Sequence, residues 1–472
     1  MKTRRTVEWI VAGVLAAVLL SGGSLLAIAH RDVAEALGLT REGAPTTAPS
    51  TLFDLPDPTP TGVEATGTGL ISEAELPAQG TLPSREVLEA KLKSLDTSKL
   101  TGLGAISYEV LDASTGEVVA SQSPNTPLIP ASNTKTLTAV AVLNAFSGSE
   151  TFATRVVQPT AGQVVLVGGG DPLLLSVPAA EGAYPQPPTT QQLATATAEA
   201  LKAEGQTSVT LGFDSSYFAE PGWNETWPSN YRDQVTQLSA LWVDEGKLAA
   251  GGRSRTPALD AAKIFAAQLA EQGITVVGEP VAATGDGPEV ARVESLPLHV
   301  LVETAMNRSN NSFTEILGLQ LAKHLGEPTT FAGSVTAIEQ QLRALDLWDE
   351  GTVLHDASGL SRSNRITANM LAEAMRLLDT EPQLSVLLDG LPTAGVTGTL
   401  ADRFTDDLSR PARGVARAKT GTLSMVSTLA GTTLTSDGRL VTFAFIINGP
   451  PDGWAAKVWT DQATGVVTAC GC

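Results

Sequence analysis

A serine and a lysine three residues apart, Ser132 and Lys135, are the first residues in this chain whose spacing suggests chemistry. They begin an apolar-rich segment, 132–146, that is typical of a buried helix. Residues three apart share one face of a helix, so the lysine amine can touch the serine hydroxyl. A desolvated lysine can accept the serine proton and make the hydroxyl a nucleophile. The pair alone is a weak signal, because so short a pattern often occurs by chance.

Two further polar groups stand where side chains could assist such a nucleophile. Ser309 and Asn311 belong to a polar hexad that is predicted to be a loop between two apolar helices. Lys419-Thr420-Gly421 is predicted at the end of a strand. Lysine and threonine suit a carboxylate ligand, and glycine lets an extended substrate approach the strand. Three such groups in this order, each in a fitting context, are unlike a chance coincidence.

The predicted elements separate the two ends of the chain from its middle. Near both ends we expect strands at 104–111, 117–121, 415–419, 426–433 and 440–447. Helices are expected at 84–95, with Ser84 as its cap, and at 132–146, 297–306, 313–325, 330–345, 367–378 and 455–469. Between residues 150 and 295, strands at 151–158, 163–167, 208–213 and 275–277 accompany helices at 191–204 and 259–272. These patterns predict one sheet built from both ends of the chain and interrupted by a separate α+β insertion.

These motifs resemble those of the penicillin-binding protein and serine β-lactamase superfamily, over a region from about residue 86 to the end. The long block after the first motif, the sequence Gly168-Gly169-Gly170-Asp171-Pro172 and the stretch 356–362 narrow the resemblance to class C low-molecular-mass penicillin-binding proteins, a group of peptidase family S13 type. The terminal Cys470-Gly471-Cys472 looks actinobacterial. The resemblance implies an α/β (α+β) fold in which an antiparallel sheet flanked by helices joins an all-helical part. It also implies D-alanyl-D-alanine carboxypeptidase or endopeptidase activity without cofactor or metal.

The resemblance also implies roles for the motif residues. Ser132 would attack the carbonyl of the penultimate D-alanine of a peptidoglycan stem peptide, after Lys135 had taken its proton. Ser309 would pass a proton to the leaving amine, and Asn311 would hold Lys135 and the substrate amide. The remaining substrate contacts would come from Lys419, Thr420 and Gly421, with an oxyanion hole formed by the backbone N–H groups of Ser132 and Thr422. β-Lactam antibiotics would acylate the same serine.

Two other functions fit parts of this pattern. A serine β-lactamase also hydrolyses its acyl-enzyme, although the large insertion and the N-terminal spacer speak against it. A catalytically inactive cell-wall-binding protein could keep the fold, although the intact motifs disfavour it. The separation of 174 residues between Lys135 and Ser309 is short for two full inserted domains, so we expect one insertion or two trimmed ones.

Composition excludes several other classes of function. A net charge of −19 and a pI near 4.7 argue against a nucleic-acid-binding protein, which needs a basic face. The four histidines are scattered, no His-Glu-x-x-His occurs, and His355 beside Asp356 is read as a loop-packing residue rather than half of a dyad. Two cysteines at the C-terminus allow a tail disulfide, a free thiol pair or no role.

The N-terminal region predicts where the protein works. Residues 1–30 combine a basic start with an apolar run from Trp9 to Ala29, which predicts a signal peptide or a membrane anchor. Residues 31–83 are rich in proline and threonine and predict a flexible spacer. We therefore expect the catalytic domain, 84–149 and 296–472, and the insertion, 150–295, to lie outside the cytoplasmic membrane, attached to it if the first segment is not cleaved.

Two features of the insertion are expected to be structural rather than functional. The glycines of 168–170 follow a strand as in a phosphate loop, but no Gly-Lys-Ser/Thr comes after them, so a tight turn is expected. Trp223, Trp227, Tyr231 and Trp242 could line a groove for glycan or peptide, and core packing is the commoner outcome.

Overall fold

The computed structural model describes residues 80–100, 104–219 and 222–471. The predicted membrane-targeting segment 1–30 and nearly all of the predicted spacer lie outside these ranges, as does Cys472. Within them, no helix is both long and apolar enough to cross a membrane. Cys470 is buried and disulfide-bonded.

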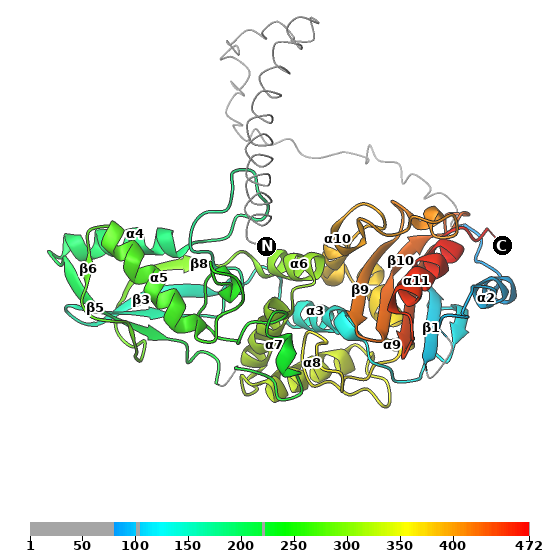
Figure 1. The fold of residues 1–472 in the computed structure, drawn as a ribbon, viewed down its shortest axis with the longest axis horizontal. Helices are drawn as coiled ribbons and strands as arrows, with labels where there is room; N and C mark the ends of the chain where they lie inside the picture. Colours follow the sequence, from blue (N-terminus) through cyan, green and yellow to red (C-terminus); the bar gives the residue numbers. More distant parts are fainter. Residues whose placement is uncertain (1–79, 101–103, 220–221, 472) are drawn as a thin grey trace, which may run out of the picture. The chain divides into compact units, whose positions relative to one another are not determined.

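A five-stranded antiparallel sheet joins the two ends of the described chain (Figure 1). Its order is β2-β1-β11-β10-β9. The strands are β1 (Ala105–Asp112), β2 (Val118–Gln122), β9 (Arg417–Leu423), β10 (Val426–Leu434) and β11 (Leu440–Asn448). The pairing of β1 with β11 sets Ala105 opposite Asn448. The prediction of one sheet drawn from both ends is confirmed.

The two faces of this sheet enter different cores because successive side chains of a strand point to opposite faces. Leu429 and Phe443 pack with α2 (Arg85–Lys93) and α11 (Gly453–Thr468), and Figure 1 shows α11 lying along β10. Ala430 and Ala444 are the next residues on each strand and pack on the opposite side. The helices on that side are α3 (Thr134–Ala145) and α9 (Ala368–Thr380).

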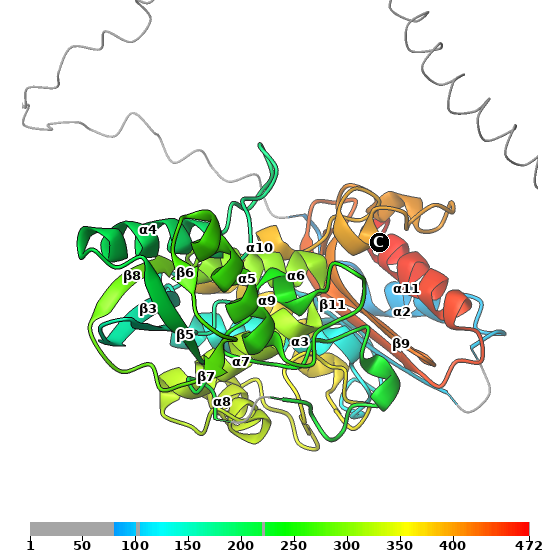
Figure 2. The same cartoon turned by 60° about the vertical axis from the view of Figure 1, so that its left-hand side comes forward.

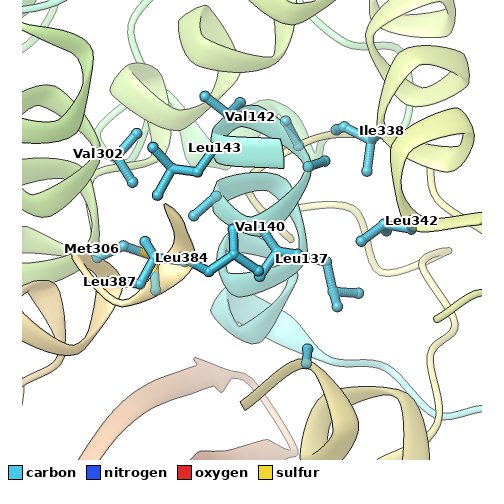
Figure 3. Packing of buried hydrophobic residues seen from close by; sticks show 14 of the residues in the cluster. Leu137, Val140, Val142, Leu143, Val302, Met306, Ile338, Leu342, Leu384 and Leu387 are labelled. Carbon is cyan, nitrogen blue, oxygen red and sulfur yellow. The ribbon is translucent and has the colours of Figure 1, made fainter. Parts of the chain in front are cut away.

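The all-helical part surrounds α3, in which every residue from Thr134 to Leu143 is buried (Figure 3). A helix that is buried all round needs partners on every side. The neighbouring helices are α6 (Leu298–Arg308), α7 (Asn311–Leu325), α8 (Phe331–Ala344) and α10 (Leu387–Gly390). Leu137 and Val140 thus lie among Ile338, Met306 and Leu387. This packing fixes α3 and with it the position of Lys135.

The middle of the chain forms a second, mixed sheet (Figure 2). Its strands are β3 (Ala153–Thr160), β4 (Gln163–Val167), β5 (Ser208–Asp214), β6 (Thr275–Val276), β7 (Val281–Ala282) and β8 (Glu289–Glu294). β3 is antiparallel to β4 and β8, whereas β4, β6 and β7 run parallel to β5. The helices α4 (Thr190–Ala203) and α5 (Pro257–Glu271) share one core with this sheet. The predicted fold class, a helix-flanked antiparallel sheet with a helical part and an inserted α+β region, is confirmed.

Several local predictions need correction. The polar hexad is mostly helical, since α6 extends to Arg308 and α7 begins at Asn311. Lys419-Thr420-Gly421 lies within β9 rather than at a strand end, because pairing with β10 continues to Leu423. Ser84 occupies the N-cap position of α2, but its side chain makes no capping hydrogen bond.

Candidate active site

Ser132 lies on a short 3₁₀ turn, Ala131–Asn133, that leads into α3. Ala131 has a left-handed backbone (φ 48°), a conformation that non-glycine residues rarely adopt and that often marks functional sites. Lys135 follows in the first turn of α3, and its Nζ lies 3.1 Å from Ser132 Oγ. The predicted contact between amine and hydroxyl is therefore present.

Lys135 is fully buried and donates two more hydrogen bonds. Asn311 Oδ1 accepts one at 2.7 Å, and the backbone carbonyl of Ser358 accepts the other at 2.6 Å. Burial lowers the pKa of Lys135 to about 7, while the nearby carboxyl groups of Asp356 and Glu315 act in the opposite direction. An amine with this pKa exchanges its proton near neutral pH, which is what a general base requires.

Two buried carboxyl groups beneath Lys135 hold the segment that carries Ser358. Glu315 on α7 accepts hydrogen bonds from the backbone N–H groups of Ala357 and Ser358. Asp356 accepts from the backbone of Gly359 and from other donors: Ser361 N, Asn364 Nδ2 and Trp227 Nε1. Burial, aided by the charge of Asp356, raises the pKa of Glu315 to about 8. The sequence singled out the stretch 356–362 only by resemblance, and nothing in the spacing marked Glu315.

Lys419 is the second fully buried lysine, and it joins β9 to the second motif. Its Nζ donates to Ser309 Oγ at 2.7 Å and to the carbonyl of Thr420 at 2.8 Å. Burial, reinforced by the positive charge of Lys135, lowers the pKa of Lys419 well below its usual value. Ser309 ends α6 in a left-handed conformation (φ 50°), which turns the chain towards α7. A hydroxyl bonded to a buried amine can relay a proton.

Asn311 is the first residue of α7 and bridges two parts of the fold. Its Oδ1 accepts from Lys135, while its Nδ2 donates to the carbonyl of Gln234 at 3.0 Å. The preceding Asn310 caps α7 by accepting from Phe313 N, so the start of the helix is fixed. Gln234 belongs to the segment 222–243 between β5 and α5, and no sequence pattern indicated that this segment would reach the site.

Gly421 is required by the segment that carries the nucleophile. A Cβ at this position would lie 2.1 Å from Thr428 Oγ1, 2.7 Å from the carbonyl oxygen of Pro130 and 3.1 Å from Ser132 N. Thr428 also donates to that carbonyl and accepts a hydrogen bond from Asn133 Nδ2. We expected glycine here for the approach of substrate, and the structure adds the close packing of residues 130–132 against β9 and β10.

β9 is an edge strand whose outer side is only partly covered. Ala418 donates its N–H to the carbonyl of Pro392, and Ala416 accepts from Ala394. Because backbone direction alternates along an antiparallel strand, the N–H of Thr422 also points to this outer edge, beyond the covered part. An extended ligand can add to such an edge as a further strand. The side chain of Thr420 meets Thr399 at 2.9 Å nearby.

A cavity of about 680 Å³ opens over these groups. Of the predicted site residues, Ser132, Ser309, Asn311, Thr420 and Thr422 line it. Lys135, Lys419 and Gly421 lie behind this lining, where they contact it. Further lining residues that the sequence did not indicate are Asn230, Asp233, Gln234, Thr399, Arg403 and Lys457. The arrangement can activate a hydroxyl, bind an extended chain and offer positive charge to a carboxylate.

The aromatic residues of the insertion divide between two roles. Trp227 and Trp242 are buried, and Trp227 donates to Asp356 at 2.7 Å. Trp223 is half-buried, and Tyr231 lines the cavity over Ser132. In the ranges that the structure describes, no three His, Cys, Asp or Glu side chains are grouped so that they could hold a metal ion.

Comparison with known proteins agrees with this geometry. The model of the D-Ala-D-Ala carboxypeptidase 3 (S13) family matches residues 92–251 and 246–469. A carboxypeptidase of Mycobacterium tuberculosis is 34% identical over an alignment of 381 residues, and the match covers 76% of this chain and 80% of the relative. Carboxypeptidase DacB of Mycolicibacterium smegmatis is 34% identical over 384 residues, covering 78% of this chain and 82% of the relative.

Among solved structures, penicillin binding protein 4 (dacB) from Haemophilus influenzae shares the fold. The match has a TM-score of 0.66 at 20% identity and covers 79% of this chain and 97% of that chain. A second structure of that protein, complexed with a novel β-lactam, matches with a TM-score of 0.60 at 21% identity over the same shares of the two chains.

Proposed function

The chain belongs to the D-Ala-D-Ala carboxypeptidase 3 (S13) family, and we propose that it hydrolyses the terminal D-alanyl-D-alanine bond of peptidoglycan stem peptides through an acyl-enzyme on Ser132. The observation that carries this proposal is the contact of 3.1 Å between Lys135 Nζ and Ser132 Oγ. The lysine is fully buried, and its pKa of about 7 leaves a large neutral fraction at physiological pH. β-Lactams would react with the same hydroxyl.

In the proposed reaction, Lys135 takes the proton of Ser132 as its oxygen attacks the penultimate carbonyl. The N–H groups of Ser132 and Thr422 stabilise the oxyanion, at about 3 kcal/mol per donor. The leaving D-alanine amine receives a proton through Ser309, which Lys419 holds at 2.7 Å. The terminal carboxylate is bound by Thr420 and by the positive side chains that line the same cavity, Arg403 and Lys457. Water then cleaves the ester and regenerates Ser132.

The proposed centre also fits cross-linked substrates. A cross-linked stem peptide presents the same D-alanyl bond, so endopeptidase action follows from the same centre.

We propose that residues 84–149 and 296–472 form the catalytic domain and that 150–295 form its insertion. In support of this, β1, β2 and β9–β11 share one sheet and β3–β8 share another. We place the enzyme in the cell-wall space, with the segment 1–30 as its signal or anchor.

Two measurements on the full chain test this function. Fluorescent penicillin should label the protein but not its Ser132→Ala variant, while a Ser147→Ala control at an exposed position should label normally. Mass analysis of a defined pentapeptide should show loss of one D-alanine by the wild type. Undiminished labelling of Ser132→Ala would disprove the assigned nucleophile. Turnover of β-lactams without any release of D-alanine would favour a β-lactamase instead.

A further inference from the structure

A second cavity, of about 970 Å³, lies in the middle part of the chain. It is bounded by the ends of β5 and β7, the start of α5 and the segment 222–239, and Phe331 of α8 also lines it. Figure 2 shows β5, β7 and α5 side by side at this place. Its volume is near the top of the range of about 300–1,000 Å³ that is usual for ligand pockets. The proposed reaction makes no use of it.

The lining combines aromatic faces with polar side chains. Phe213, Trp223 and Phe331 are half-buried, and the indole of Trp223 is held by Arg232, 3.6 Å from its ring centroid. The polar lining residues are Asp214, Ser215, Ser216, Gln237, Ser239, Arg255, Thr256 and Thr284. Apolar faces beside amide, carboxylate and hydroxyl groups fit a ring that has one C–H face and a polar rim. A pyranose sugar with an acetamido group has that chemistry.

Arg255 is the most available donor of this cavity. Its side chain is exposed, and it forms no ion pair or hydrogen bond within the described residues. Beside it, the side chain of Thr256, the N-cap residue of α5, accepts no hydrogen bond from the N–H groups of the first turn of the helix. Asp214, by contrast, is already fixed by the N–H groups of Ser216 and Gly285. The cavity therefore offers hydrogen-bond donors to an incoming acetamido or hydroxyl oxygen.

One segment forms a wall of both cavities. Trp223 and Gln237 line the second cavity, and Asn230, Tyr231, Asp233 and Gln234 line the cavity over Ser132. This segment is attached to α7 at two points, since Thr236 N donates to Ser312 Oγ at 2.9 Å and Gln234 accepts from Asn311. A polymeric substrate that fills the second cavity would thus lie against the segment that also borders the reaction centre.

We propose that this second cavity binds an N-acetylated amino sugar of the glycan strand that carries the stem peptide. The inference rests on the proposed function, because that function supplies a substrate in which sugar and peptide are covalently joined. The aromatic residues contact the C–H face of the sugar, and Arg255 and Gln237 bind its polar rim. Sugar binding raises the local concentration of the attached peptide at Ser132 and so selects polymer-borne substrate over free peptide.

The test compares a disaccharide-linked pentapeptide with the same pentapeptide without sugar. For the wild type, kcat/KM for release of D-alanine should be roughly tenfold higher with the disaccharide, the effect of about one charged hydrogen bond. Arg255→Ala and Thr284→Trp, which fills the cavity from an exposed position, should abolish this preference and leave hydrolysis of the free pentapeptide unchanged. Lys202→Ala removes an exposed cation of α4 and should retain the preference.

A binding measurement separates this inference from the proposed function. Calorimetry with the disaccharide alone should detect binding to the wild type and about tenfold weaker binding to Arg255→Ala, whether or not the protein hydrolyses peptides. Equal kcat/KM for the two substrates, together with no binding of the disaccharide, would overturn the sugar site while leaving D-alanine release intact. Equal losses on both substrates in Arg255→Ala would also overturn it. Absence of any D-alanine release would contradict the proposed function alone.

Discussion

Lys419 donates a hydrogen bond to Ser309 at 2.7 Å and so connects β9 to the junction of α6 and α7. Two residues later, Asn311 accepts a hydrogen bond from Lys135 at 2.7 Å. The Ser-x-Asn group therefore contacts both buried lysines, one on each side. The positive charge of Lys135 repels that of Lys419, and this repulsion adds to burial in lowering the pKa of Lys419. Changes in the middle group should consequently affect proton transfer more than folding.

Ser309→Ala should lower kcat by about 10²–10⁴-fold, because a positioned proton-transfer group contributes about that much. The leaving amine then has no hydroxyl relay, and Lys419 loses one of its two hydrogen-bond acceptors. Steady-state release of D-alanine from a pentapeptide measures the effect, with the exposed Ser385→Ala as control. A kcat for Ser309→Ala within twofold of the wild type would remove Ser309 from the proposed mechanism.

Asn311→Asp should move the acidic limb of the pH profile towards higher pH. In the wild type, kcat/KM should rise with pH through about 7 as Lys135 loses its proton. A carboxylate in place of the amide oxygen at 2.7 Å favours the charged amine and should raise the pKa of Lys135 by about 1–3 units. The variant should therefore be weak at pH 7 and recover near pH 9. A loss that is the same at every pH would contradict this role.

Glu315→Gln should change how stability depends on pH. The pKa of Glu315 is about 8 in the folded chain and near 4.5 when unfolded, so the folded state holds its proton more tightly. Stability from this group is present below pH 4.5 and is lost as pH rises towards 8. Glutamine should carry a constant penalty, because its amide group faces one of two backbone N–H donors, but no such loss. Urea unfolding measures this difference. Between pH 5 and pH 8, the free energy of unfolding of the wild type should fall by about 1 kcal/mol or more relative to that of the variant. Equal changes at both pH values would refute the assignment.

Gly421→Ala should disturb the nucleophile through packing alone. The added methyl would have to displace Thr428 or the segment 130–132, at a cost of about 1–3 kcal/mol, and Ser132 would shift away from Lys135. We expect a lower rate of acylation by fluorescent penicillin together with a lower melting temperature. Gly453→Ala is a matched control, because a Cβ there meets nothing within 4 Å. If Gly421→Ala is acylated at the rate of the wild type, residues 130–132 can move without affecting the reactivity of Ser132.

The order of the motifs could be read from the sequence because each is short and lies on an element with clear periodicity. Ser132 and Lys135 are neighbours on one turn, so local geometry was enough to place them together. The sheet built from both ends also followed from strand patterns. The helix boundaries near Ser309 could not be predicted in this way. Polar residues of the hexad continue α6 and begin α7 because of capping and tertiary contacts, which periodicity does not encode.

The support around the site could not be predicted, because it depends on contacts between distant segments. Glu315 looks like an ordinary residue of an apolar helix, yet it binds the backbone beside Ser358. Gln234 contributes only a backbone carbonyl to Asn311, which no residue type can reveal. Thr428 and Asn133 join β10 to the turn of Ser132 across 295 residues, and this pairing appears only when the sheet is assembled.

The pairing of β1 with β11 has a consequence for folding during synthesis of the enzyme. Ala105 lies opposite Asn448, so the central strand of the catalytic sheet, β11, is synthesised long after its partner β1. Contacts of such sequence separation form late and slowly. A growing chain that already contains Ser132 and Lys135 still lacks β9 to β11 and with them Lys419. Ser132 therefore lacks the hydrogen-bonded Lys419–Ser309 pair and the neighbouring strand edge until β9 to β11 have been added.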